Sequence, residues 1–346
     1  SMDYIARFRN EKQFQAGVQL LRGMIDAAQA GDFLSVLADI ALAETLHAVS
    51  EEFEKSHGKI AGGRLAIIAL GKLGSREMTF GSDVDLVFVY DAPADAVSDG
   101  GKQYNASVYY NRLTQRLLNA IGAMGREGRL YEVDMRLRPS GGQGLINTSL
   151  KGLHQYFSDA AWTFEYMAFT KARVAAGDAA LAGEINHFID EILSAPRDRE
   201  KLKQDVIDMR ERIAKEFASD DVWNLKYVRG GLIDLDFIAQ YLLLLHASVL
   251  KESVTGNTET ILRWLAAKGA IESPLADELV EASRTLNQLF HMLRLCNNGT
   301  LDEATALPGL KKLLCAALKT PDFDHLKQGL IGVERNVARH YIALLQ

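Results

Sequence analysis

Asp83 and Asp85 lie two residues apart in a segment, 82–90, whose alternating side chains predict a β-strand. Because side chains at positions i and i+2 of a strand point to the same face, the two carboxylates can reach one divalent cation. Hard oxygen ligands of this kind suit Mg²⁺, whose other positions are filled by phosphate oxygens and water. An Asp-x-Asp pair alone is common in proteins, so the assignment depends on what surrounds it.

A third carboxylate, Asp134, lies in a later segment, 130–139, that also alternates and is predicted to end as a strand at Pro139. The polar residues predicted to share one face of it are Glu132, Asp134, Arg136 and Arg138. If the two strands are neighbours, three carboxylates converge, as two-metal phosphoryl or nucleotidyl transfer requires. Asp134 would hold the metal ion nearest the attacking hydroxyl and could assist removal of its proton.

A glycine turn precedes the aspartate pair. Residues 65–70 predict a short buried strand that runs into the turn 71–74, where backbone N–H groups can hold a phosphate. The residues predicted to contact nucleotide phosphates in this region and on the later strand are Gly71, Lys72, Gly74, Ser82, Arg136 and Arg138. The structural alternatives are a solvated lysine at Lys72 and salt bridges from the two arginines to Glu132 or to the helical part of the chain.

Helices are predicted before, between and after these strands. Apolar residues at three- and four-residue steps predict helices over 3–57 and 105–124, and from about residue 150 almost to the end. The later helices include residues 205–217, 232–249, 273–297 and 324–345. A chain of 346 residues is expected to form two or three structural units. The predicted units are a helical preface (1–60), a catalytic domain (61–185) and a regulatory or substrate-docking helical bundle (186–346).

Composition narrows the class of protein. Hydrophobic residues make up 48% of the chain and charged residues 24%, as in ordinary globular proteins, and a net charge of -6 gives no general attraction to nucleic acid. No apolar run reaches the roughly 20 residues that cross a bilayer, so no membrane span is predicted. Cys296 and Cys315 lack the spacing of a zinc site or a disulfide framework, which favours a reduced cytoplasmic interior. The N-terminus has no signal pattern and is compatible with a longer natural protein.

The motifs resemble the nucleotidyltransferase superfamily that includes DNA polymerase beta, in which a Gly-Ser turn is followed about a dozen residues later by Asp-x-Asp. Gly71 precedes Asp83 by 12 residues, although Lys72 replaces the serine. Segments 71–78 and 82–86 are similar to one branch, the glutamine synthetase adenylyltransferases. Further similar segments follow in order at residues 130–141, 161–165, 171–178 and 230–237. Gly81 and Asp236 depart from that family's pattern, which more often has serine and glutamate there.

The resemblance implies an α+β fold, with a small mixed-sheet, polymerase beta-like domain between an N-terminal helical preface and a C-terminal helical bundle. It also implies transfer of AMP from ATP to a tyrosine hydroxyl of glutamine synthetase, with release of pyrophosphate. The metal ligands for Mg²⁺ or Mn²⁺ would be Asp83, Asp85 and Asp134. Lys171 and Arg173 would meet nucleotide phosphates, and ion pairs with Glu165 or Asp178 are an equal alternative. Glutamine and the PII signalling protein would be regulators.

The family enzyme has two similar halves, one that removes AMP by phosphorolysis and one that attaches it. Residues 130–134 and 161–165 resemble the attaching, C-terminal half more closely. The alternatives are the phosphorolytic reaction, a uridylyltransferase of the related PII-modifying type, and a non-catalytic module that binds glutamine synthetase or PII. Trp162 and Phe164 are expected in the core in preference to an adenine-stacking role.

Overall fold

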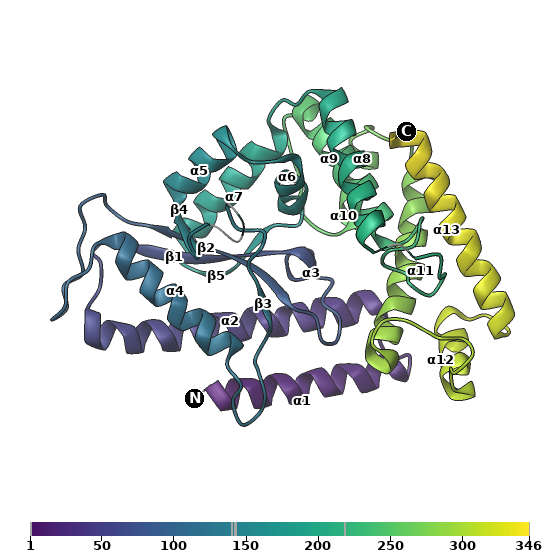
Figure 1. Ribbon diagram of the computed structural model, residues 1–346, viewed down its shortest axis with the longest axis horizontal. Helices are drawn as coiled ribbons and strands as arrows, with labels where there is room; N and C mark the ends of the chain where they lie inside the picture. The colour runs from purple at the N-terminus through teal and green to yellow at the C-terminus, as the bar shows by residue number, and fades with distance from the viewer. Residues whose placement is uncertain (1, 140, 142–143, 218, 346) are drawn as a thin grey trace. The chain divides into compact units, whose positions relative to one another are not determined.

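The computed structural model describes residues 2–139, 141, 144–217 and 219–345 (Figure 1). The chain divides into two compact units. The first comprises residues 1–14, 34–78 and 82–192, and the second comprises residues 15–33, 79–81 and 193–346. The predicted domain boundaries at residues 60 and 185 stay predictions.

A small mixed sheet forms the centre of the first unit. Its strands are β1 (Arg64–Leu70), β2 (Val84–Asp91), β3 (Val133–Asp134), β4 (Asn147–Ser149) and β5 (Arg173–Gly177). β1 pairs antiparallel with β2 and β5, whereas β2 pairs parallel with β3 and β4. The strand order is β3-β2-β1-β5, with β4 also on β2. This mixed sheet with helical flanks confirms the predicted α+β fold.

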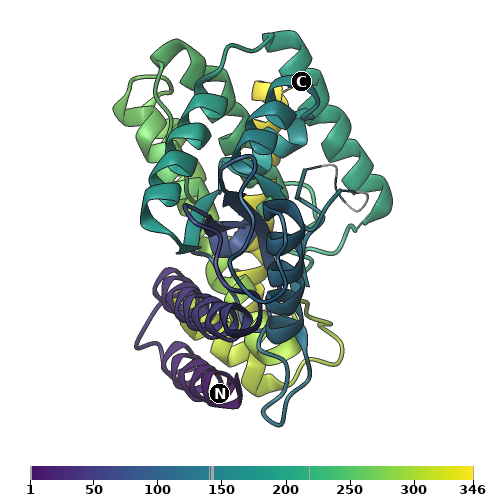
Figure 2. The ribbon, with the colours of Figure 1, turned by 90° about the vertical axis from the view of Figure 1, so that its left-hand side faces the viewer.

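Helices cover both faces of this sheet. Those of the first unit are α3 (Gly71–Gly74), α4 (Ala106–Gly122), α5 (Leu150–Asp159), α6 (Thr163–Phe169) and α7 (Ala179–Ser194), with parts of α1 (Met2–Leu21) and α2 (Ala27–His57). α5, α6 and α7 lie on one face, and α2 and α4 on the other (Figures 1 and 2). Ile67 and Ile68 are therefore both fully buried although they point to opposite faces. The predicted helix 105–124 is confirmed, with Asn105 as its N-cap.

The prediction of a strand over residues 130–139 is wrong except at Val133 and Asp134. Only Val133 and Asp134 pair with β2, and the chain turns over residues 136–139. The backbone N–H of Arg138 donates to the carbonyl of Met135 at 3.3 Å, as in a turn. Arg136 and Arg138 therefore do not lie on a strand face.

The second unit is a helical bundle, as predicted for the C-terminal half. Its helices are α8 (Arg199–Glu216), α9 (Leu232–Leu250), α10 (Thr258–Ala267), α11 (Ser273–Asn297), α12 (Pro308–Leu318) and α13 (Phe323–Leu345). α2 and α9 are long and apolar enough to cross a membrane by length and composition alone. In their most apolar windows, 39% and 56% of the residues are buried inside the protein, so both helices also serve the core.

A buried ion pair between Arg210 of α8 and Asp234 of α9 gives the segment 230–237 a structural role. Both side chains are 1% exposed, and Arg210 also donates to the carbonyl of Tyr227 at 3.1 Å. Gly230 precedes α9 with φ +83°, and a Cβ there would lie 1.8 Å from the carbonyl oxygen of Glu334. The motif therefore fastens the start of α9 to α8 and α13.

Glu334 of α13 carries a buried carboxyl group. It is 7% exposed, and its Oε1 accepts no hydrogen bond from the residues that the structure describes. Burial raises the pKa of Glu334 to about 8, and the negative charge of Asp221 adds to the effect. The folded protein thus keeps a proton on Glu334 that the unfolded chain, with its ordinary pKa of 4.5, releases.

The pKa of Glu334 is higher in the folded protein than in the unfolded chain, so the free energy of unfolding falls as the pH rises from about 4.5 to about 8. Above about pH 8 the stabilisation from this proton is fully lost. Glu334→Gln removes the titrating group. We expect this variant to gain roughly 2 kcal/mol over the wild type at pH 9 and much less at pH 5, as measured by urea unfolding. The exposed Glu216→Gln variant of α8 is the control. Equal gains at both pH values would contradict the expectation.

Candidate active site

Asp85 and Asp134 are neighbours on two parallel strands. The register of β2 and β3 pairs Val84 with Val133 and Asp85 with Asp134. Paired positions in adjacent strands place their side chains on the same face of the sheet, so the two carboxylates lie side by side. Asp83 is exposed and precedes β2 by one residue.

The turn between β1 and β2 is built around the carboxylate of Asp85. Gly71 has φ +53°, and a Cβ at this position would lie 2.1 Å from Asp85 Oδ2. Only glycine therefore lets the turn pass so close to the carboxylate. Gly74 has a different role, because a Cβ there would lie 2.0 Å from the carbonyl oxygen of Lys171. Its missing side chain lets α3 pack directly on the backbone before β5.

Arg136 holds both carboxylate oxygens of Asp134. The backbone N–H of Arg136 donates to Oδ1 at 2.8 Å, and its Nε and Nη2 donate to Oδ2 at 2.8 and 2.5 Å. Burial acts to raise the pKa of Asp134, but these hydrogen bonds and the positive charge of Arg136 together hold that pKa below its ordinary value. The charge of Arg136 also interacts with Asp85 and Asp83. One exposed guanidinium thus partly neutralises all three predicted ligands.

Arg138 is anchored within its own loop. Its Nη1 donates to the carbonyl of Met135 at 2.8 Å and its Nη2 to that of Gly144 at 3.4 Å. Glu132 forms its ion pair with Arg129, at 3.3 Å. The predicted alternative, an ion pair of Glu132 with Arg136 or Arg138, is therefore wrong. Arg138 shapes the loop that follows β3.

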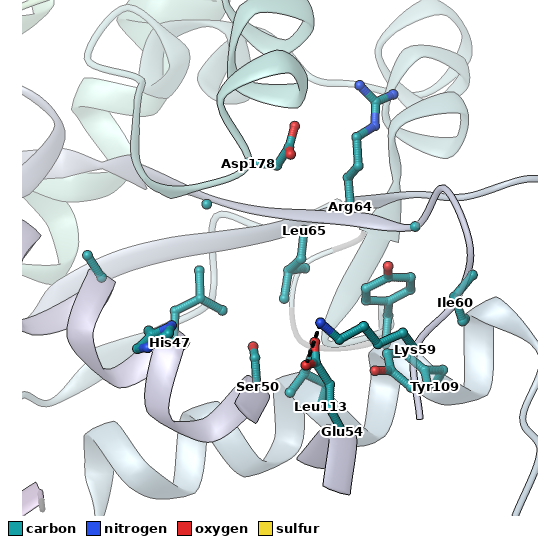
Figure 3. A pocket seen from close by; sticks show the side chains of 15 residues that line it. His47, Ser50, Glu54, Lys59, Ile60, Arg64, Leu65, Tyr109, Leu113 and Asp178 are labelled. Carbon is teal, nitrogen blue, oxygen red and sulfur yellow. Dashed lines mark ion pairs between the residues drawn. The ribbon is translucent and has the colours of Figure 1, made fainter. Parts of the chain in front are cut away.

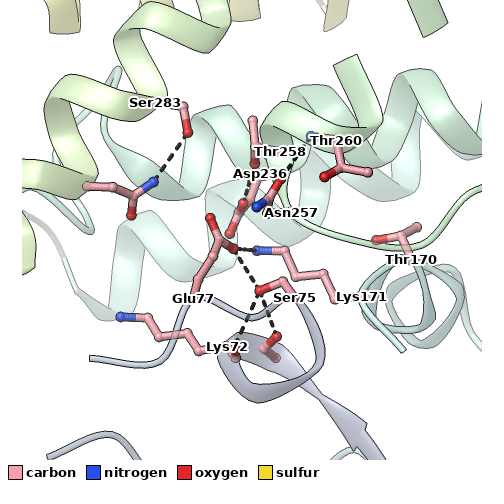
Figure 4. A network of polar contacts seen from close by, with 12 residues as sticks. Lys72, Ser75, Glu77, Thr170, Lys171, Asp236, Asn257, Thr258, Thr260 and Ser283 are labelled. Atoms are coloured by element: carbon pink, nitrogen blue, oxygen red, sulfur yellow. Dashed lines mark hydrogen bonds and ion pairs between the residues drawn. The ribbon is translucent and has the colours of Figure 1, made fainter. Parts of the chain in front are cut away.

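Lys171 and Arg173 brace the glycine turn. Lys171 Nζ lies 3.4 Å from Glu77 Oε2, which also accepts a hydrogen bond from Ser75 at 2.7 Å (Figure 4). Arg173 donates to the carbonyls of Leu73 and Gly74 and pairs with Asp39 at 2.8 Å. These contacts fix the end of α3 against β5 and α2.

The alternative partners predicted for these two cations, Glu165 and Asp178, are wrong. Glu165 accepts from the Tyr156 hydroxyl at 2.6 Å and from the backbone of Trp162, and Asp178 accepts from the backbone N–H of Leu181. Both carboxylates therefore serve the starts of helices. Nothing in the sequence signals the true partners, Glu77 and Asp39.

The remaining predicted residues border the site. Lys72 is half-buried in α3, and Figure 4 shows its amine pointing away from the Glu77–Lys171 pair. Ser82 is half-buried directly before Asp83. Trp162 and Phe164 are 66% and 37% exposed, so the prediction that they belong to the core is wrong.

No group of three Asp, Glu, His or Cys side chains is assembled for a metal ion within the part of the chain that the structure describes. In this structure Arg136 bonds both oxygens of Asp134, and Asp83 lies outside the strand. The donor set nevertheless fits Mg²⁺ or Mn²⁺, because Asp85 and Asp134 offer hard oxygen atoms from neighbouring positions.

A cavity of about 490 Å³ lies in the first unit at the other end of β1 (Figure 3). Its lining includes His47, Glu54 and Lys59, with the start of β1 at Leu65 and Tyr109 of α4. The candidate site lies where β1 ends, at Gly71, so this cavity is separate from it. No motif in the sequence pointed to the cavity.

A small mixed sheet that carries paired carboxylates beside a glycine turn is the arrangement expected of a nucleotidyltransferase. A family model described as glutamate-ammonia ligase adenylyltransferase matches residues 1–188, and one described as GlnD PII-uridylyltransferase matches residues 200–319. The chain belongs to the glutamate-ammonia ligase adenylyltransferase family.

Curated relatives agree with this family. The bifunctional glutamine synthetase adenylyltransferase/adenylyl-removing enzyme of Mesorhizobium japonicum is 41% identical over 346 residues, which is 100% of this chain and 35% of the relative. The protein of the same name from Brucella suis is 43% identical over 331 residues, 95% of this chain and 34% of the relative. The chain spans about a third of the length of these relatives.

Gly71→Ala should damage the site without unfolding the protein. The new Cβ would push the Asp85 carboxylate aside, and we expect Mn²⁺ binding, measured by titration calorimetry, to weaken about tenfold or more. Gly183→Ala in α7 is the control, because a Cβ there meets nothing within 4 Å. Mn²⁺ affinity equal to that of the wild type would show that Gly71 does not determine the position of the ligand.

Proposed function

We propose that this chain transfers AMP from ATP to a tyrosine hydroxyl of glutamine synthetase and releases pyrophosphate. The observation that carries the proposal is the pairing of Asp85 with Asp134 beside the Gly71 turn, which places two carboxylates where a metal-bound triphosphate can be held. Membership in the glutamate-ammonia ligase adenylyltransferase family supports the nature of the reaction.

We assign Asp83 and Asp85 to the metal ion that carries the triphosphate, and Asp134 to the metal ion nearest the acceptor hydroxyl. Bound Mg²⁺ or Mn²⁺ would polarise the phosphate and stabilise the charge that develops on it. The hydroxyl gives up its proton to solvent water, its oxygen attacks the α-phosphorus, the bond from that phosphorus to the oxygen shared with the β-phosphate breaks, and pyrophosphate leaves. A carboxylate that binds a metal ion is a poor proton acceptor, which favours a ligand role for Asp134 over that of general base.

Phosphate contacts are assigned to the residues around the glycine turn and to the nearby cations: Gly71, Lys72, Gly74, Ser82, Arg136, Arg138, Lys171 and Arg173. Among these, Arg136 is the most available, because its side chain is 86% exposed. Arg173 and Lys171 already brace α3, so we assign them mainly to holding the turn in place and only secondarily to a phosphate.

The attaching direction is proposed for this chain because residues 130–134 and 161–165 resemble the attaching half of the family enzyme. The relatives' names include both the adenylyltransferase and the adenylyl-removing activity, so phosphorolytic removal of AMP is the second candidate. We further propose a cytoplasmic location, with glutamine and PII as regulators. The match of residues 200–319 to a PII-uridylyltransferase model favours a PII-related role for the bundle.

Asp85→Asn should abolish transfer while sparing the fold. Loss of one carboxylate removes a metal ligand, and we expect the rate of ³²P incorporation from α-labelled ATP into glutamine synthetase to fall about a thousandfold. Asp95→Asn, an exposed aspartate in the loop after β2, is the matched control and should retain the wild-type rate. Activity that survives Asp85→Asn would refute the metal assignment.

The same preparation separates the competing functions. Release of AMP from adenylylated glutamine synthetase without any attachment would establish the phosphorolytic alternative. Labelling of PII from UTP would establish the uridylyltransferase alternative. Binding of glutamine synthetase with neither reaction, under Mg²⁺ and Mn²⁺, would establish a non-catalytic module.

A further inference from the structure

Arg136 and the proposed metal ion compete for the same atoms. Both oxygens of Asp134 accept hydrogen bonds from Arg136, and Asp134 Oδ2 accepts two of them from the guanidinium. A divalent cation bound to Oδ2 would meet this guanidinium at close range, and the two positive charges would repel each other. Arg136 would therefore have to leave Oδ2 for a metal ion to bind that atom.

Little holds Arg136 where it is. Its side chain is 86% exposed, whereas that of Asp134 is 13% exposed. Among the described residues its guanidinium donates hydrogen bonds only to Asp134, in contrast to Arg138, which is anchored on two backbone carbonyls. The backbone N–H of Arg136 can keep its bond to Oδ1 after the side chain has left, so the carboxylate stays oriented.

The attraction that keeps the guanidinium in place comes from the same three carboxylates that a metal ion would neutralise. Its charge interacts with Asp134 first and then with Asp85 and Asp83. Once they are neutralised, a bound triphosphate would offer this long, exposed side chain a new anionic partner. A guanidinium fork matches phosphate oxygens as well as it matches a carboxylate.

We propose that Arg136 exchanges partners during the reaction cycle: it holds Asp134 in the empty site and moves to the triphosphate when the metal ion and nucleotide bind. The inference rests on the proposed function, because it takes Asp134 as a metal ligand and ATP as substrate. Arg136 then performs two tasks in turn. It keeps the carboxylates from repelling one another in the empty site, and it stabilises the negative charge of the departing pyrophosphate.

Arg136→Gln tests the exchange through two affinities with opposite expected changes. Without nucleotide, the affinity for Mn²⁺ should rise about tenfold, because the competitor for Asp134 is gone. With Mg²⁺ at saturation, the affinity for α,β-methylene-ATP should fall about tenfold, because the phosphate contact is gone. Both are measured by titration calorimetry, with thermal unfolding as the check that the fold is intact.

Arg126→Gln is the matched control, because it removes another exposed arginine, from the loop after α4, and should change neither affinity. An arginine that stays on Asp134 would give the rise in Mn²⁺ affinity without the fall in nucleotide affinity. An arginine that serves only phosphate would give the fall without the rise. Either result overturns the exchange.

The outcome is separable from that of the proposed function. Neither affinity measurement needs a protein acceptor. If Arg136→Gln shows both affinity changes but the wild-type chain does not label glutamine synthetase, only the proposed function is refuted. If the wild-type chain labels glutamine synthetase but Arg136→Gln does not change the Mn²⁺ and nucleotide affinities in opposite directions, only the exchange is refuted.

Discussion

Two like charges, those of Asp85 and Asp134, lie directly opposite each other in the short pairing of β2 with β3. Cross-strand pairs of like charge destabilise a sheet, so the pairing of Asp85 with Asp134 needs a compensating cation. In this structure Arg136 supplies it, and it also lowers the pKa of Asp134. The pairing thus brings two negative charges together, and Arg136, whose side chain is 86% exposed, offsets part of this charge.

The rest of the first unit keeps this pair in place. β2 is buried on both faces, with Leu86 and Val87 each 1% exposed, so the strand that carries Asp85 is packed into the core. Gly71 brings the turn onto the Asp85 carboxylate, and Arg173 ties the end of that turn to α2 through Asp39. The sheet fixes where the carboxylates lie, and the turn fixes how Asp85 is oriented.

An apolar run predicted the strand at residues 65–70 and alternation predicted the strand at residues 82–90; β1 and β2 confirm both, except that Asp83 precedes β2. The same period misled at residues 130–139. There Arg136 follows Asp134 by two positions because it reaches back to that carboxylate, and Arg138 follows because it bonds Met135 within a turn. Polar residues that make local contacts in a turn can thus produce the same two-residue alternation in sequence as the face of a strand.

The partners of Lys171 and Arg173 could not be predicted for a different reason. Glu77 and Asp39 lie 94 and 134 residues earlier in the chain, and only the folded sheet brings them near. Glu165 and Asp178 were close in sequence, but each was already engaged at the start of a helix. Nearness in sequence is a poor guide to the partner of a charge when local backbone N–H groups compete for it.

Backbone carbonyls decide which arginines of this protein are fixed and which are available. Arg173 and Arg210 each find carbonyl acceptors as well as a carboxylate, and both are shielded from water. Such a side chain cannot leave without exposing several acceptors at once, and each unsatisfied acceptor is costly. Arg136 finds no carbonyl among the described residues, and its carboxylate partner can accept a metal ion in its place. A cation that can be replaced in this way is suited to act on a substrate, whereas one bonded to the backbone is suited to hold the fold.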